Sequence, residues 1–189
     1  TAGSLQAAQN LTFTSTAGTL RNQSGRIEGG NIAKIQAAVI DNTAGRLIAG
    51  GQELNVKATA GSLINTGGLI GANGLASLSA QTLVNRDGGQ VLTGKDLTLI
   101  TPGGIDNTRG SLFAGGSLTF NQAAAHINNT QGDIGANGSL TLTARDVTNT
   151  RGTVAANTDL SLTANSFTPD GKILAGRDLT IHLAQSYTH

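Results

Sequence analysis

Cysteine, methionine and tryptophan are absent from the 189 residues, and only 12% of the chain is charged. The missing cysteines exclude disulfide bonds and thiol chemistry. Aromatic residues make up only 3% of the chain, so a roughly spherical core would be hard to fill at the usual packing density. The net charge of +1 comes without a basic cluster, which argues against nucleic-acid binding. No apolar run approaches the ~20 residues that a membrane-spanning helix needs, so we expect no membrane insertion.

Glycine is abundant, at 27 residues, and one glycine recurs at the same position of an internal repeat. The stretch NTGGLIGANGLASLSAQTLVN (65–85) aligns without a gap on NTQGDIGANGSLTLTARDVTN (129–149). Both follow a unit of 20–23 residues that places a glycine shortly after an asparagine and then a branched aliphatic two residues later. The repeat asparagines are Asn22, Asn42, Asn65, Asn85, Asn107, Asn129 and Asn149.

Within each unit the apolar residues alternate with polar ones, as in GSLTLTA and TDLSLTA. A period of two places one set of side chains inward on a strand, whereas a helix face needs a spacing of three to four. A unit of this length is too short for a strand, a packed helix and a return strand. The sequence therefore predicts an all-β fold, a single parallel β-solenoid over residues 1–189. We expect about nine coils, each of three strands and roughly triangular in section, along a rod of roughly 40 Å.

The asparagine and the glycine of each unit predict corners. Asparagine tolerates left-handed backbone conformations and bonds its own local backbone. Stacked at one coil spacing, successive carboxamides can also bond one another along the rod, as a ladder. We expect the glycine to supply the positive φ that a tight corner requires.

The consensus N-T-x-G-x-I-x-A-x-x-x-L-x-L-x-A, from Gly3 to about Leu183, resembles the haemagglutinin repeats of filamentous haemagglutinin-type exoproteins. That group includes bacterial adhesins and contact-dependent growth inhibition proteins. The resemblance implies a right-handed β-helix, a secreted or cell-surface location, and an outer-membrane two-partner secretion transporter as the partner during export. A receptor on a host or neighbouring cell is a further expected partner. Because the chain begins in the middle of a unit, we expect an internal segment of the shaft.

Catalysis finds little support in the sequence, and we predict no enzyme activity, metal or cofactor. The histidines His126, His182 and His189 share no coil with a serine and an aspartate in a recognisable order. Asp159 and Asp178 occupy one slot in adjacent coils, about 5 Å apart, and either bind a cation or accept backbone N–H bonds at a turn. A carbohydrate-active enzyme of the pectate-lyase type is the alternative function.

Two outward-facing columns complete the candidates. The slot between the two core residues of the long strand is rich in Thr and Ser, from Thr12 to Thr180, and a regular array of this kind is typical of ice binding. The outward slot of the short strand after the glycine holds four apolar residues. These form a candidate partner surface, unless inserted corners cover them: Ile48, Leu92, Phe113 and Leu174.

Overall fold

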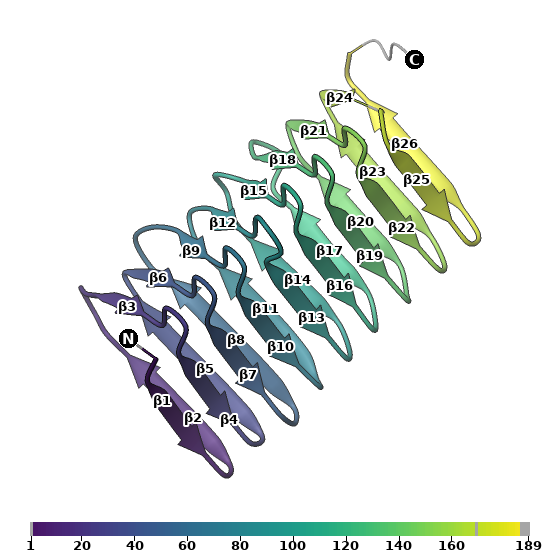
Figure 1. The fold of residues 1–189 in the computed structure, drawn as a ribbon. Helices are drawn as coiled ribbons and strands as arrows, with labels where there is room; N and C mark the ends of the chain where they lie inside the picture. Colours follow the sequence, from purple (N-terminus) through teal and green to yellow (C-terminus); the bar gives the residue numbers. More distant parts are fainter. Residues whose placement is uncertain (1, 169, 186–189) are drawn as a thin grey trace.

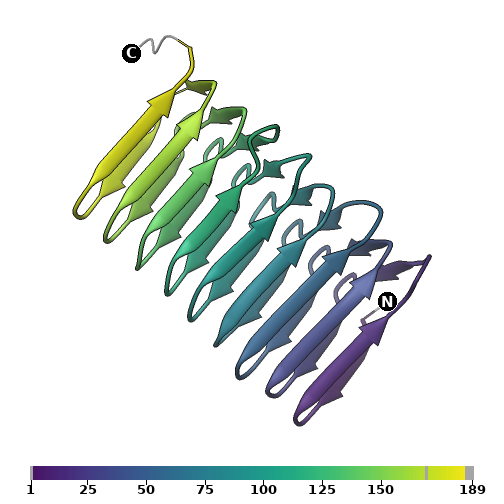
Figure 2. The same ribbon diagram turned by 180° about the vertical axis from the view of Figure 1, so that it is seen from behind.

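The computed structural model describes residues 2–168 and 170–185, which form 26 strands and no helix. Every strand pairing within the three sheets is parallel, and neighbours in a sheet are one turn of the chain apart. Figures 1 and 2 show the strands stacked along one axis, with the two termini at opposite ends. The structure is a β-solenoid of nine coils with three sheets around one core, as predicted.

We number the coils from the N-terminus. Among the described residues, coils 1 to 8 each contribute one strand to each sheet, in the order sheet A, sheet B, sheet C, and coil 9 contributes to sheets A and B. Sheet A contains β1 (Ser4–Ala7), β4 (Arg26–Gly29), β7 (Arg46–Ala49), β10 (Leu69–Ala72), β13 (Gln90–Thr93), β16 (Ser111–Ala114), β19 (Asp133–Ala136), β22 (Thr153–Ala156) and β25 (Lys172–Ala175). Sheet B contains β2 (Asn10–Thr14), β5 (Ile32–Ala37), β8 (Glu53–Ala58), β11 (Leu75–Ser79), β14 (Leu97–Ile100), β17 (Leu118–Asn121), β20 (Leu140–Thr143), β23 (Leu160–Ala164) and β26 (Leu179–Leu183). Sheet C contains β3 (Thr19–Arg21), β6 (Val39–Asp41), β9 (Leu63–Ile64), β12 (Leu83–Val84), β15 (Ile105–Asp106), β18 (His126–Asn128), β21 (Asp146–Thr148) and β24 (Ser166–Thr168).

The register stacks equivalent residues directly over one another. Ile70 pairs with Val91, and Val91 pairs with Leu112, so the aliphatics that follow the repeat glycines form one inward column. The long strands behave in the same way, since Leu118 and Phe120 are completely buried while the threonine between them is exposed. The inward pairs of the two end coils are exceptions, because a covering coil is lacking on one side among the described residues. Leu11 and Phe13 are only partly buried, and Leu179 and Ile181 are exposed.

The repeat glycine does not play the role predicted from the sequence. Among the described residues, the repeat glycines lack the positive φ, which falls instead on the residue before the glycine in seven coils: Ser24, Ala44, Gly67, Gly88 (preceded by Asp87, also at positive φ), Arg109, Gln131 and Arg151. At Gly110 an added Cβ would lie under 3.0 Å from the carbonyl oxygen of Asn85 in the coil before and from the carboxamide of Asn107. Glycine is needed there because the backbone passes close to the asparagines, and not because of its φ.

The described residues form no helix, and therefore none that could span a membrane.

Candidate functional site: an asparagine ladder and the outer faces

The seven repeat asparagines lie one above another at the corner between sheet C and sheet A. Each Nδ2 from Asn22 to Asn129 donates to the Oδ1 of the asparagine in the next coil, at 2.7 or 2.8 Å, so six bonds run without a break from Asn22 to Asn149. Six of the side chains are completely buried, and Asn22 at the end is 5% exposed. The structure thus places all seven residues in one continuous ladder.

Each carboxamide also holds the backbone at its corner. The Nδ2 of Asn107 donates to the carbonyl oxygen of Asp133 in the next coil at 3.0 Å and to that of Gly110 at 3.3 Å. Its Oδ1 accepts the amide of Asn85 at 2.8 Å. Because only a short carboxamide both donates and accepts at this distance from the backbone, neither Asp nor Leu can replace the asparagine without leaving a buried polar group unpaired.

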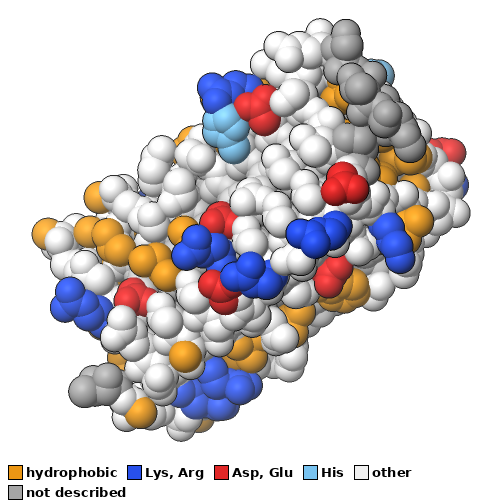
Figure 3. Space-filling model, turned by 45° about the horizontal axis from the view of Figure 1, so that its top comes forward, with side chains coloured by type: hydrophobic (Ala, Val, Ile, Leu, Met, Phe, Trp, Pro, Cys, Tyr) orange, Lys and Arg blue, Asp and Glu red, His pale blue; other side chains and the backbone are white. Residues whose placement is uncertain are grey.

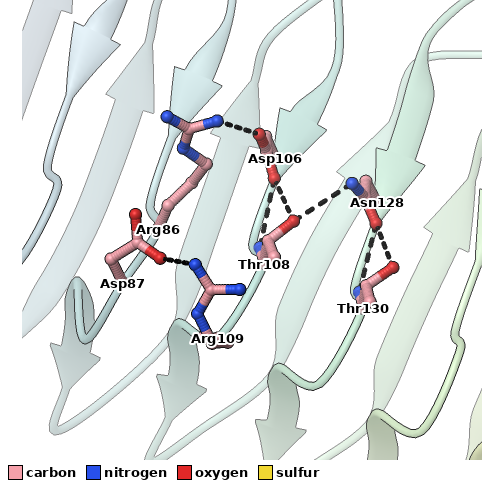
Figure 4. A network of polar contacts seen from close by, with 7 residues as sticks. All are labelled: Arg86, Asp87, Asp106, Thr108, Arg109, Asn128 and Thr130. Atoms are coloured by element: carbon pink, nitrogen blue, oxygen red, sulfur yellow. Dashed lines mark hydrogen bonds and ion pairs between the residues drawn. The ribbon is translucent and has the colours of Figure 1, made fainter.

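A second line of polar bonds runs on the solvent side of the ladder (Figure 4). Asp106 Oδ1 accepts the N–H and the hydroxyl of Thr108, at 3.1 and 2.6 Å, and Asn128 holds Thr130 in the same way at 3.1 and 2.7 Å. The Nδ2 of Asn128 then donates to the Thr108 hydroxyl at 3.1 Å, which joins the two coils. We did not predict this line of bonds. The sequence does contain a pattern that indicates it, because the repeat asparagine is preceded by Asp or Asn and followed by Thr in these coils.

Ion pairs extend this outer line. Arg86 contacts Asp106 at 3.5 Å, and Arg109 pairs with Asp87 (Figure 4). Figure 3 shows acidic and basic side chains interspersed on this side of the rod. At Asp41, partial burial acts to raise the pKa, but hydrogen bonds from Thr43 and Gln23 and the charge of Arg21 outweigh it, so the pKa is lowered. The charges therefore strengthen coil-to-coil contacts and present no field of one sign.

The outer face of sheet A carries an uninterrupted apolar column, which we call the apolar stripe. In direct register it consists of Ile48, Gly71, Leu92, Phe113, Gly135, Ala155 and Leu174. Three of the four predicted residues are exposed, with Leu92 at 38%, Phe113 at 37% and Leu174 at 54%, while Ile48 is half-buried. The inserted corners leave the stripe open to solvent.

The small residues of the stripe shape its relief. A Cβ added at Gly71 would lie 3.2 Å from Ile48 Cδ1, and one at Gly135 would lie 3.1 Å from Phe113 Cδ2, so each large side chain leans over a neighbouring glycine. A hollow of about 360 Å³ opens at Gly71, between Ile48 and Leu92. The stripe is therefore a row of apolar knobs and depressions, and the glycines and the alanine within it were missed in the sequence.

Sheet C brings together a histidine, an aspartate and a serine from three consecutive coils, beside a hollow of about 500 Å³. His126 Nδ1 lies 2.9 Å from one oxygen of Asp146, and the Ser166 hydroxyl donates to the other at 2.6 Å. The hydrogen bond from Ser166, and then the one from Arg145, lowers the pKa of Asp146. Because the carboxylate stands between serine and imidazole, the imidazole is not in position to take the proton of the Ser166 hydroxyl, as it does in a hydrolytic triad.

The other candidate residues are dispersed. His182 is exposed on sheet B, and His189 lies outside the described residues. Arg177 forms an ion pair with Asp159 and also lies 3.7 Å from Asp178, so its guanidinium group takes the place of the suggested cation. The hydrogen bond from Arg177 lowers the pKa of Asp159. Among the described residues, no cluster of three or more His, Cys, Asp or Glu side chains is placed to hold a metal ion.

The hydroxyl column on sheet B is continuous over six coils: Ser77, Thr98, Thr119, Thr141, Ser161 and Thr180. The adjacent outward column, two residues along the strand, lacks this regularity because Ile100 and Asn121 stand in it. Paired hydroxyls on one strand occur at Thr141 and Thr143 and at the equivalent slots of the next coil. The face carries one line of hydroxyls and no two-dimensional array.

Stacked strands, an unbroken ladder and short corners define a class of protein, the solenoid shaft in which each coil rests only on its neighbours. The model of the haemagglutinin repeat matches residues 1–52, 34–109, 113–168 and 159–189, and the chain belongs to this family. It is a filamentous haemagglutinin-like adhesin shaft. Searches of the curated proteins and of the solved structures each found no match.

Proposed function

We propose that this shaft holds a distal adhesive or toxin-delivery element away from the cell that produces it. The observation that carries the proposal is the unbroken stacking, in which each coil joins the next through parallel strand pairs in sheets A and B. Over seven coils an Asn–Asn bond is added at one corner. In such a rod the stability is a sum of repeat and neighbour-interface terms, so length can be added coil by coil without a new core.

Export by two-partner secretion to the cell surface is part of the same proposal. A chain that passes through an outer-membrane transporter unfolded must not be locked by cross-links before it arrives, and this chain has no cysteine. Its contacts link residues about 20 positions apart, so each coil can fold onto the one before it as the chain emerges. On this view the receptor lies on a host or neighbouring cell. The part of the filament that binds it is the distal element and not the shaft.

A competition assay tests the proposal. The purified 189-residue chain is added to producing cells and target cells, and adhesion or toxin delivery is measured. A shaft without its own receptor site leaves both unchanged. Inhibition that saturates with the added chain would show that this segment itself binds the receptor, and the proposal would fail.

A pair of deletions in the parent filament tests the stacking. Removing residues 65–106 takes out two whole coils and joins Ile64 to Asn107 in register, so surface display should persist on a shorter filament. Removing residues 65–96 takes out one and a half coils and misaligns every column that follows. That matched control should lose folding and display; equal display of both variants would contradict a register-dependent shaft.

A further inference from the structure

The residues of the apolar stripe alternate in size in a pattern that is complementary to itself. From coil 4 to coil 9 the sizes are small, large, large, small, small and large: Gly71, Leu92, Phe113, Gly135, Ala155 and Leu174. We propose that this face of sheet A packs on the same face of a second copy of the chain. The two rods run antiparallel, and the two-fold axis lies parallel to the strands, between coils 6 and 7.

In this register Leu92 of one copy lies over Ala155 of the other. Phe113 is set opposite Gly135, and because each Phe113 ring already leans over Gly135 of its own chain, the two rings pack against each other beside the two-fold axis. Leu174 enters the hollow at Gly71, whose volume of about 360 Å³ is sufficient for an aliphatic side chain. The two-fold axis makes each contact occur twice, so the six coils of the interface contain three kinds of contact. The side chains interdigitate as they do between facing sheets.

The neighbouring outward column agrees with the same register. From coil 3 to coil 9 it reads Arg46, Leu69, Gln90, Ser111, Asp133, Thr153 and Lys172. A two-fold axis parallel to the strands brings this column opposite itself. Ser111 then faces Asp133, Gln90 faces Thr153, and the stem of Lys172 lies over Leu69. No two like charges meet.

Other arrangements fail on size or on charge. An axis through coil 6 sets Lys172 against Arg46, two like charges. An axis through coil 7 sets Asp133 against itself and Leu92 against Leu174. Parallel rods place each coil opposite its own copy, so that Phe113 meets Phe113 while Gly71 meets Gly71 and leaves a gap.

The area indicates a weak, reversible contact. Six coils at 4.8 Å cover about 29 Å, and four residues of strand cover about 13 Å, so each copy buries roughly 380 Å². A stable complex buries about 800 Å² on each partner.

Sedimentation equilibrium of the 189-residue chain tests the pairing. The weight-average mass should rise with concentration from 19.0 kDa toward twice that value. The double variant Leu92→Ser, Phe113→Ser should remain at the monomer mass. The matched control is Leu75→Ser, because Leu75 is 47% exposed on sheet B, outside the stripe, and this variant should associate like the parent chain. A mass of 19.0 kDa at all concentrations, or equal loss in the control, would overturn the proposal.

Spin labels test the orientation, and the absence of cysteine makes each introduced thiol unique. Gln52 in coil 3 and Lys95 in coil 5 are exposed at the same edge of sheet A. In the antiparallel register, labels on Gln52→Cys lie seven coil spacings apart, about 34 Å, and labels on Lys95→Cys lie three apart, about 14 Å. Equal distances at the two sites would mean parallel rods and would overturn the proposed register.

Discussion

Replacing Asn107 with alanine breaks the asparagine ladder near its middle. The side chain is completely buried, donates to Asn129 Oδ1 at 2.7 Å and to the Asp133 carbonyl at 3.0 Å, and accepts from Asn85 at 2.8 Å. Alanine removes these three bonds and the longer one to the Gly110 carbonyl at 3.3 Å. The amide of Asn85 keeps only its bond to the carbonyl of Ser111, and the Asn129 oxygen loses its donor from the coil below.

The structure gives the size of the effect. Each buried polar group left without a partner costs about 1–3 kcal/mol, so the two neighbouring carboxamides together lose about 2–6 kcal/mol. Asn22 is the matched comparison because it stands at the end of the ladder and donates to Asn42, while no ladder asparagine among the described residues donates to it. Asn22→Ala should therefore cost about half as much, roughly 1–3 kcal/mol.

The measurement is urea unfolding followed by far-UV circular dichroism, with the free energy of unfolding taken by linear extrapolation. An isosteric variant, Asn107→Asp, separates the hydrogen bonds from the packing, because an ionised aspartate fills the same space but has no proton to donate to Asn129, and burial penalises its charge. It should be at least as unstable as Asn107→Ala. A loss below about 1 kcal/mol at Asn107, or an equal loss at Asn22, would refute the ladder as a source of stability.

Three further changes follow from the same coordinates. Gly110→Ala should cost about 3 kcal/mol or more in urea unfolding because its Cβ meets the Asn85 carbonyl, whereas Gly3→Ala, with nothing within 4 Å, should cost little. Thr101→Val should increase the free energy of unfolding by about 1 kcal/mol and so raise the melting temperature, because the buried Thr101 hydroxyl has no partner among the described residues. The pKa of Asp146 is lowered on folding, so its contribution to stability is complete above the unfolded pKa of about 3.9 and is lost as the pH falls through the folded value. Thermal melts from pH 7 to pH 2 should decline below about pH 4, and less steeply in Asp146→Asn.

The inward half of the fold could be predicted because it follows from strand geometry alone. Alternation with a period of two assigns Leu118 and Phe120 to one side, and a repeat of constant length then places each such pair over the previous one. Insertions did not disturb this expectation, because a corner can lengthen without changing the register of the strands. The ladder followed in the same way from the recurrence of asparagine at one corner slot.

The interpretation of the glycines went wrong because a repeated glycine has two possible causes. A sequence shows that a side chain is excluded, but it does not show whether φ or a neighbouring atom excludes it. At Gly110 the neighbour is the backbone of Asn85, one coil away, and only coordinates reveal that approach. The strained conformation lies at Arg109 beside it, a residue whose side chain gives no sign of a positive φ.

Contacts across coils on the outer faces were missed for a related reason. His126 was compared only with the residues of its own coil, yet the register places Asp146 and Ser166 of the next two coils beside it on sheet C. In a solenoid the nearest outward neighbours of a residue are about 20 positions away, so a chemical group must be sought along a column and not along a strand. A search of that kind also recovers the outer line that begins at Asp106.

The fold constrains the residues of the inward slots and leaves those of the outward slots free to vary. An inward slot must be filled in every coil, so its aliphatics carry no information beyond the core. The outward slot of sheet A faces solvent and can accept any residue, as Glu28 in coil 2 shows. From coil 3 to coil 9 that slot nevertheless contains no charged or polar side chain. Exposed apolar residues in an unbroken row contribute little to the stability of the rod, and the proposed contact with a second copy of the chain would account for them.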